Sequence, residues 1–373
     1  MAGPLYFLAG GGTAGHINPA LSIGAAIQRE DPNAKVYYMV TEDGLEKDMV
    51  AESGQASLQI SASELPKDFG SLLRFIGKTS CGLWSSIALI RKYKPNAVIG
   101  TGGYVGAPML LAAKWMKVPI LIHEQNSIPG RSNRQMASFA KSICLSFEGS
   151  ESYFSASEQE RCVLTGNPIK KLFFERKREE CRRELGLSED TELIVIMGGS
   201  LGSRRINQAV GALPHLPEWN DFLREHPKLM ICLSGGSVNS RFLEDIPEDE
   251  SHIQSHNYID STLWMPAADL LVGRAGAGFL METAACGVPS ILIPFPQAAD
   301  GHQKANAEVF VDHGASIMIE DELLDGKRLL EALKELMSRR EMLKEMGAAA
   351  YKLATPRAAE DIAAECRRIA ATR

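Results

Sequence analysis

The chain has 373 residues, of which 45% are hydrophobic and 23% are charged, with a formal net charge of −6. This length suits about two globular domains, and the acidic balance excludes a general affinity for nucleic acid. The seven cysteines form no C-x-x-C pair, which excludes a zinc ribbon and indicates reduced thiols. No apolar run approaches the roughly 18 residues that span a bilayer, so we expect any membrane contact to be peripheral.

The chain opens with an apolar run, Leu5–Ala9, followed by a GGGTAGH motif that ends at His16. We expect a strand, a phosphate-accommodating turn and a helix with Pro19 in its first turn. The motif contains G-x-G-x-x-G, and Glu42 or Asp43 could supply the acid of a dinucleotide site. His16 could take a proton from a hydroxyl near neutral pH, or could only cap the helix.

The stretch Leu72–Lys94 mixes bulky apolar residues with cations and contains no acid. Apolar and aromatic side chains ringed by cations suit the surface of an anionic bilayer. The alternative is a core-packing helix with a basic edge. The expected membrane-facing residues are Leu72, Phe75, Ile76, Leu83, Trp84 and Trp115.

Two more polar loops follow apolar runs in this half: GTGGY at Gly100–Tyr104, and HEQN at His123–Asn126. Carboxyl ends of parallel strands share one edge of a sheet, where open α/β sheets bind ligands. These loops should therefore converge with the first glycine motif. A hydrogen-bonded network without a ligand is the alternative for HEQN.

The alternation of apolar runs and glycine-rich loops restarts after Thr165–Pro168. Its loops include GGSLG at Gly198–Gly202 and RAGAG at Arg274–Gly278. The glycines of the second motif open a helix whose N-terminus could hold a diphosphate. Glu282 lies on the same helix face as Gly278 and could accept hydrogen bonds from ribose hydroxyls, or could be an ordinary ion-paired residue. The amide of Gln303 could distinguish among the hydroxyl groups of a sugar.

Alternating strand and helix signals predict the α/β class, with two Rossmann-like, doubly wound parallel sheets. We find no D-x-D metal motif after a strand and no P-loop. We therefore expect no metal site and no required cofactor, with a divalent cation at most assisting. Helix N-termini and backbone amides would then stabilise a leaving diphosphate.

Seven motifs in this order resemble the MurG family of bacterial N-acetylglucosaminyltransferases. They are GGGTAGHINPAL (10–21), GTGGYVGAP (100–108), HEQNSIPG (123–130), TGNPI (165–169), GGSLGSRRIN (198–207), GRAGAGFLMETAACGVPSILIPFP (273–296) and DGHQKANA (300–307).

The resemblance implies a GT-B fold whose two domains face each other across a cleft. Residues 1–166 would form the acceptor and membrane-facing domain, and 167–355 the UDP-sugar domain. A final helix over Pro356–Ala371, within residues 356–373, would pack back on the first domain.

The resemblance also implies an inverting transfer of N-acetylglucosamine from UDP-N-acetylglucosamine to the 4-hydroxyl of undecaprenyl-pyrophosphoryl-N-acetylmuramyl-pentapeptide. This reaction belongs to peptidoglycan synthesis, and so to cell shape, division and the cell cycle. It would take place at the cytoplasmic face of the inner membrane, on an anionic surface.

The resemblance also implies roles for individual residues, through the motifs that contain them. The implied catalytic and acceptor-side residues are His16, Tyr104 and Glu124. The implied donor-binding residues are Thr13, Ala14, Gly15, Asn126, Lys170, Ser200, Ile259, Arg274, Ala277, Gly278, Phe279, Glu282 and Gln303. Ser200 and Ala277–Phe279 would face the diphosphate, Glu282 the ribose, and the backbone of Ile259 the uracil.

This chain departs from many relatives at Ala14, where glycine is common, and at Lys170, where arginine is common. His16 is the expected general base, with Glu124 as its rival. Two other functions stay open at this point. A nucleotide-dependent oxidoreductase would bind NAD or FAD at the first glycine motif, and a non-catalytic membrane adaptor would bind the nucleotide sugar without turnover.

Overall fold

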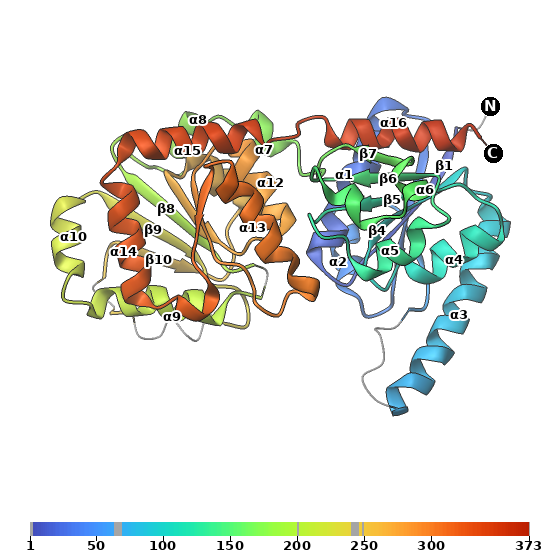
Figure 1. Ribbon diagram of the computed structural model, residues 1–373, viewed down its shortest axis with the longest axis horizontal. Helices are drawn as coiled ribbons and strands as arrows, with labels where there is room; N and C mark the ends of the chain where they lie inside the picture. Colours follow the sequence, from blue (N-terminus) through green and yellow to red (C-terminus); the bar gives the residue numbers. More distant parts are fainter. Residues whose placement is uncertain (1–2, 63–68, 200, 240–245, 248–249, 373) are drawn as a thin grey trace. The chain divides into compact units, whose positions relative to one another are not determined.

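The computed structural model describes residues 3–62, 69–199, 201–239, 246–247 and 250–372, except for the side chains of residues 69–78. The chain forms two compact units (Figure 1). Unit 1 comprises Met1–Lys170 and Thr355–Arg373, and unit 2 comprises Lys171–Ala354. Each unit is built on its own parallel sheet, as the sequence predicts for the α/β class.

The sheet of unit 1 has seven strands in the order β3-β2-β1-β4-β5-β6-β7. They are β1 (Leu5–Gly10), β2 (Lys35–Val40), β3 (Ser57–Gln59), β4 (Ala97–Gly102), β5 (Ile120–Glu124), β6 (Ser142–Leu145) and β7 (Cys162–Leu164). The strand order reverses between β1 and β4. Ligands of open α/β sheets bind beyond the carboxyl ends of the strands at such a point.

Helices cover both faces of this sheet. They are α1 (Ala14–Glu30), α2 (Leu45–Glu52), α3 (Phe69–Tyr93), α4 (Ala107–Trp115), α5 (Arg131–Ala137), α6 (Ala156–Gln159) and α16 (Ala358–Ala370), with a 3₁₀ turn at η1 (Ser150–Tyr153). Successive β1 side chains point to opposite faces. Tyr6 and Leu8 pack with residues of α1 and α16, whereas Phe7 and Ala9 pack with residues of α3 and α4.

Unit 2 has a six-stranded sheet in the order β10-β9-β8-β11-β12-β13, and its order reverses between β8 and β11. The strands are β8 (Glu192–Met197), β9 (Leu229–Ser234), β10 (Ile253–His256), β11 (Leu270–Gly273), β12 (Ser290–Leu292) and β13 (Ser316–Met318). The buried runs of β8 and β11 match the continuous apolar stretches in the sequence, which is typical of strands covered on both faces.

The helices of unit 2 follow the same βα alternation. They are α7 (Leu172–Glu175), α8 (Arg178–Glu184), α9 (Arg204–Ala212), α10 (Trp219–Glu225), α11 (Ser261–Ala267), α12 (Ala277–Cys286), α13 (His302–Asp312), α14 (Gly326–Met337) and α15 (Arg340–Lys352). The described residues of unit 2 also form 3₁₀ turns at η2 (Leu213–His215), η4 (Ala299–Gly301) and η5 (Asp321–Leu323).

Two predicted helix starts are wrong. Pro19 lies inside α1, because the helix begins at Ala14, with Thr13 as its N-cap residue. The proline ring removes the helical bond to the carbonyl of Gly15, four residues earlier, but does not prevent the helix from starting there. Pro356 lies before α16 rather than in its first turn, since that helix begins at Ala358.

Candidate active site

The loop between β1 and α1 places four predicted residues at the start of a helix. Thr13 is the N-cap residue, and Ala14, Gly15 and His16 begin α1. The Thr13 hydroxyl does not cap the helix but lies 3.1 Å from Nδ1 of His16. First-turn N–H groups have no intrahelical partners, so Ala14 and Gly15 suit a polar or anionic ligand.

The His16 imidazole lies against the backbone of the loop after β4. A Cβ atom at Gly102 would stand 2.8 Å from Cδ2 of His16, and one at Gly103 would stand 3.2 Å from Nδ1. Both glycines have positive φ angles, +98° and +79°, which side chains rarely allow. The Thr101 hydroxyl donates to the His16 carbonyl oxygen at 2.8 Å. The β4 loop therefore fixes both the backbone and the ring of His16.

Tyr104 lies beside the same glycine motif. A Cβ atom at Gly12, whose φ is +85°, would stand 2.9 Å from Cε1 of the tyrosine ring. A Cβ atom at Gly103 would stand 2.1 Å from the carbonyl oxygen of Gly11. The structure thus brings His16 and Tyr104 to one pair of interlocked loops, held together by backbone approaches that only glycine permits.

Glu124 ends β5 and is 1% exposed. One carboxylate oxygen accepts hydrogen bonds from the backbone and side-chain amides of Asn126 at 2.9 and 3.1 Å. The other accepts from the N–H of Gly130 at 2.9 Å and from the Asn133 amide at 2.8 Å. A carboxylate that already accepts four hydrogen bonds has little capacity left for a substrate proton. These contacts give Glu124 the task of holding Asn126 and its loop, and the choice of base between His16 and Glu124 stays a prediction.

A second buried carboxylate in this cluster is missing from the residues singled out in the sequence. Glu46, in the first turn of α2, is 1% exposed and accepts a hydrogen bond from the N–H of Gly12 at 3.2 Å. Glu42 and Asp43, the acids considered for a dinucleotide site, are both exposed. The sequence signal that could have identified Glu46 is an acid in the first turn of the helix that follows β2.

In unit 2, two asparagines join the loops after β8 and β9. The Asn207 amide donates to the carbonyl oxygens of Gly235 and Asn239 at 2.9 and 2.8 Å. Asn239 in turn donates to the carbonyl oxygen of Gly202 at 3.1 Å. A Cβ atom at Gly202 would stand 1.9 Å from the Gly235 carbonyl oxygen, so the two loops meet backbone to backbone. Ser200, predicted to face the diphosphate, lies outside the described residues.

Arg274 connects three loops at the same edge of the unit 2 sheet. Its guanidinium donates to the Ser203 hydroxyl at 2.6 Å and to the Ile293 carbonyl oxygen at 3.1 Å. It also pairs with Asp321 at 2.5 Å. These contacts give Arg274 a role within the protein, and its contact with a donor stays a prediction.

The first turn of α12 faces open space. Gly276 is its N-cap residue without a side-chain cap, and a Cβ atom at Gly276 or Gly278 would meet no described atom within 4 Å. Ala277 begins the helix, and Phe279 packs its ring against β11. Glu282 is half-buried, one turn further along the helix. Such an N-terminus suits an anionic ligand.

The remaining predicted donor residues occupy three different segments. Gln303, near the start of α13, accepts a hydrogen bond from the N–H of Phe295 at 2.9 Å through its side-chain oxygen. Ile259 is half-buried in the loop after β10, and Lys170 is exposed at the end of the first segment of unit 1. Their roles stay predictions.

The predicted membrane-facing residues divide into two groups. Trp84 on α3 and Trp115 at the end of α4 are 67% and 62% exposed, whereas Leu83 is half-buried and packs against the core. The side chains of Leu72, Phe75 and Ile76 lie outside the described residues. Within the described chain, no helix has the length and apolar character needed to cross a membrane.

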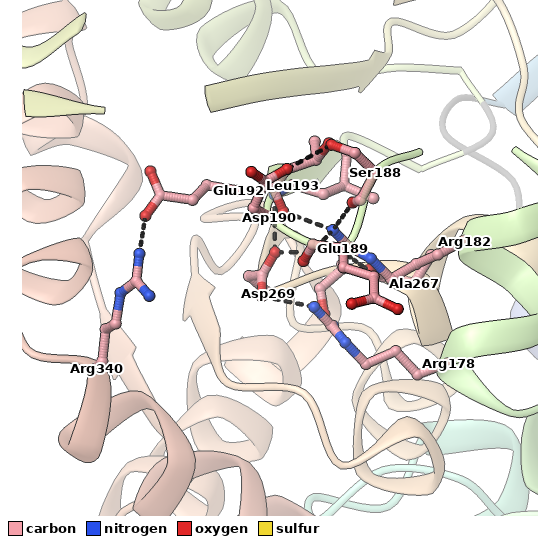
Figure 2. Close-up of polar contacts among 12 residues, drawn as sticks. Arg178, Arg182, Ser188, Glu189, Asp190, Glu192, Leu193, Ala267, Asp269 and Arg340 are labelled. Atoms are coloured by element: carbon pink, nitrogen blue, oxygen red, sulfur yellow. Dashed lines mark hydrogen bonds and ion pairs between the residues drawn. The ribbon is translucent and has the colours of Figure 1, made fainter. Parts of the chain in front are cut away.

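A polar cluster lies at the amino ends of β8 and β11, at the edge of the unit 2 sheet opposite to its glycine-rich loops (Figure 2). It borders a cavity of about 440 Å³. Arg178 and Arg182 reach Asp269 at 2.6 and 3.5 Å, and Arg340 reaches Glu192 at 2.8 Å. Because these charges pair with one another, the cluster stabilises the sheet edge. No group of three metal-ligating side chains occurs in the part of the chain that the structure describes.

Comparisons with known proteins cover nearly the whole chain. Residues 6–145 match the glycosyltransferase family 28 N-terminal domain, and residues 193–362 match its C-terminal domain. A UDP-N-acetylglucosamine–N-acetylmuramyl-(pentapeptide) pyrophosphoryl-undecaprenol N-acetylglucosamine transferase from Halothermothrix orenii is 36% identical over 93% of this chain and 94% of its own. The enzyme of that name from Moorella thermoacetica is 34% identical over 95% and 96%.

Solved structures agree with these matches. Acinetobacter baumannii MurG is 25% identical, with a TM-score of 0.74 over 98% of this chain and 99% of its own. A UDP-GlcNAc 2-epimerase from Neisseria meningitidis shares the fold at 14% identity, with a TM-score of 0.69 over 98% of this chain and 99% of its own.

Proposed function

Because the chain belongs to the MurG family within glycosyltransferase family 28, we propose that it carries out the family's transfer reaction. It moves N-acetylglucosamine from UDP-N-acetylglucosamine to the 4-hydroxyl of undecaprenyl-pyrophosphoryl-N-acetylmuramyl-pentapeptide, with inversion at the sugar, in peptidoglycan synthesis. The observation that carries this proposal is the full-length identity of 36% and 34% to enzymes named for this transfer. An oxidoreductase finds no support among these relatives.

In the proposed reaction unit 2 binds the donor. The open first turn of α12, at Ala277–Phe279, stabilises the diphosphate, and Glu282 accepts hydrogen bonds from the ribose. The backbone of Ile259 pairs with the uracil, and Gln303 contacts the hydroxyls of the transferred sugar. As the bond between the sugar C1 and the diphosphate breaks, negative charge grows on the leaving UDP, and fixed N–H groups stabilise it without reorganisation.

Unit 1 activates the acceptor in this proposal. The His16 imidazole takes the proton of the muramyl 4-hydroxyl while the hydroxyl oxygen forms the new bond to C1. Tyr104 lies beside the same loop and orients the acceptor. Thr13, Ala14, Gly15 and Asn126 offer polar contacts to the sugar. The support for His16 is its position in the first turn of α1, held by Thr13 and the β4 glycines.

We further propose that the enzyme binds peripherally to the cytoplasmic face of the inner membrane, where its lipid acceptor lies. The two exposed tryptophans of α3 and α4 support this location. On the same two helices, Arg91, Lys92 and Lys114 are exposed cations. Cations beside exposed aromatic side chains suit an anionic lipid surface. This role would link the enzyme to cell-wall growth, cell shape and division.

The deciding experiment is a transfer assay with UDP-N-acetylglucosamine and a short-chain lipid acceptor, with and without chelator. We expect formation of the disaccharide lipid and UDP, abolished by Glu282→Ala through loss of donor binding. Donor binding without product from a fully folded enzyme would instead support a non-catalytic adaptor. Stabilisation by NAD rather than UDP would support the oxidoreductase.

A further inference from the structure

We propose that Glu46 is a positioning residue for the transfer reaction, acting through the β1–α1 loop (Gly10–Thr13) on His16 and Tyr104. The inference rests on the proposed function for its effect on turnover. Its structural part, the anchoring of the loop by a carboxylate, depends only on contacts within unit 1.

The carboxylate of Glu46 bridges two segments that are distant in sequence. One oxygen accepts hydrogen bonds from the N–H and the hydroxyl of Thr41 at 3.1 and 2.5 Å, just after β2. The other accepts from the N–H of Gly12 at 3.2 Å. A Cβ atom at Gly11 would stand 2.9 Å from this second oxygen, so glycine at that position lets the carboxylate reach the loop.

The burial of this side chain needs an explanation. Glu46 is 1% exposed, and no cation among the described residues forms an ion pair with it. An ionised carboxylate away from water is costly unless hydrogen bonds compensate for its lost solvation. The three donors provide that compensation, and they fix the carboxylate between β2 and the loop. A residue needed only to fill this space could be apolar at lower cost.

The carboxylate of Glu46 holds the part of the β1–α1 loop on which the positions of His16 and Tyr104 depend. Gly12 has a φ of +85° and lies against the Tyr104 ring, and the Gly11 carbonyl oxygen lies against Gly103. Gly103 in turn lies beside the His16 imidazole. Releasing Gly12 would therefore loosen the contacts that orient both His16 and Tyr104. The N–H of Gly12 is also committed to a protein carboxylate, so it is not available to donate to a ligand.

The variant Glu46→Gln tests the proposal, because its amide group must face the N–H of either Gly12 or Thr41 and lose that bond. We expect kcat to fall about 10- to 100-fold, with the KM for the donor changed by less than about threefold. In a His16→Gln background, Glu46→Gln should reduce kcat little further, because both changes act on one unit. Ser142→Ala, which removes a 2.8 Å bond to Glu365 elsewhere in unit 1, is the control and should leave kcat near wild type.

Hydrogen exchange of the Gly11–Thr13 amides provides a readout that does not need transfer activity. We expect faster exchange in Glu46→Gln and unchanged exchange in Ser142→Ala. If the wild-type protein showed no transfer, the proposed function would fail while this measurement still tested the anchor. A folded Glu46→Gln protein with wild-type exchange, or with wild-type kcat in an active enzyme, would overturn the inference. Glu46→Asp, which keeps the charge but shortens the side chain, replaces it if the glutamine variant does not fold.

Discussion

The Nε2 atom of His123 lies 3.1 Å from the carbonyl oxygen of Gly166, near the end of the first segment of unit 1. The Gln125 amide donates to Nδ1 of the same ring at 3.0 Å, so Nε2 carries the proton and donates to Gly166. Gly166 has a φ of +85°, and a Cβ atom there would stand 2.3 Å from the side chain of Thr355. His123 therefore holds, within unit 1, the segment that leads toward unit 2, beside Thr355, where the chain returns to unit 1.

This histidine should make stability depend on pH. Complete burial lowers the pKa of His123 to about 4, so the folded protein keeps the ring neutral. As pH falls below about 6.5, the unfolded chain binds the proton first, and the stability contribution declines until about pH 4. It is fully present above about pH 6.5, and about 2 kcal/mol should be lost by pH 5. Urea unfolding at pH 7.5 and 5.0 measures this loss in the free energy of unfolding. His123→Gln should remove this part of the pH dependence. An identical pH dependence in both proteins would contradict the assignment.

The two candidates for the base should respond differently to substitution. His16→Gln should lower kcat by about 10²- to 10⁴-fold with little change in Tm, because the half-buried ring contributes mainly to chemistry. Glu124→Gln should lower Tm clearly, because four donors face its carboxylate. Measuring kcat and Tm for both variants checks this prediction. A larger kcat loss for Glu124→Gln without a change in Tm would make Glu124 the better candidate.

The close approach of Gly103 to Gly11 predicts a specific effect of adding one methyl group. Gly103→Ala places a Cβ atom 2.1 Å from the Gly11 carbonyl oxygen and should displace the loop, reducing kcat sharply. Gly54→Ala is the matched control, since its φ of +70° is similar but no described atom lies within 4 Å of the added carbon. Both variants should lose about 1 kcal/mol from the strained φ, but only Gly103→Ala should lose activity. Equal kcat values in the two variants would show that the loop contact is unimportant.

Arg182 should be a stability residue of unit 2 (Figure 2). Its side chain is 7% exposed and donates to the carbonyl oxygens of Ala267, Ser188 and Thr191 at 2.9, 2.9 and 2.6 Å. Arg182→Met leaves these acceptors without their donor and should cost about 3 kcal/mol. Calorimetry should show a lower transition temperature, whereas Arg183→Met, at an exposed position, should change it little. Similar melting of the two variants would be inconsistent with this role.

Trp84 and Trp115 should contribute to membrane binding. Replacing both by alanine should weaken binding to anionic vesicles by about 10- to 100-fold, because each exposed ring loses its apolar contact with lipid. Binding should also weaken with added salt, because the cations nearby contribute. Tyr351→Ala, which removes an aromatic side chain that is 62% exposed in unit 2, is the control. Vesicle sedimentation that does not change in the double variant would exclude this surface.

The sequence predicted the α/β class and the family because those depend on local patterns. Apolar runs such as that of β8 and the glycine motifs that follow the strands are visible without tertiary contacts. Glu46 was missed because its partner Gly12 lies 34 residues earlier, and nothing local marks the pair. The contacts of Arg274 with Ser203 and Asp321 were missed for the same reason. The start of α1 at Ala14 differs from the prediction, because proline favours the first turn of a helix whereas Pro19 lies inside this one.

The last helix has a consequence for the synthesis of the protein. Ile362, Cys366 and Ile369 of α16 share a buried cluster with Tyr6 and Leu8 of the first strand. On the ribosome, that apolar sheet face of unit 1 stays uncovered until α16 has emerged, whereas the continuous unit 2 can already fold. The nascent N-terminal half therefore presents an uncovered apolar surface throughout the synthesis of unit 2.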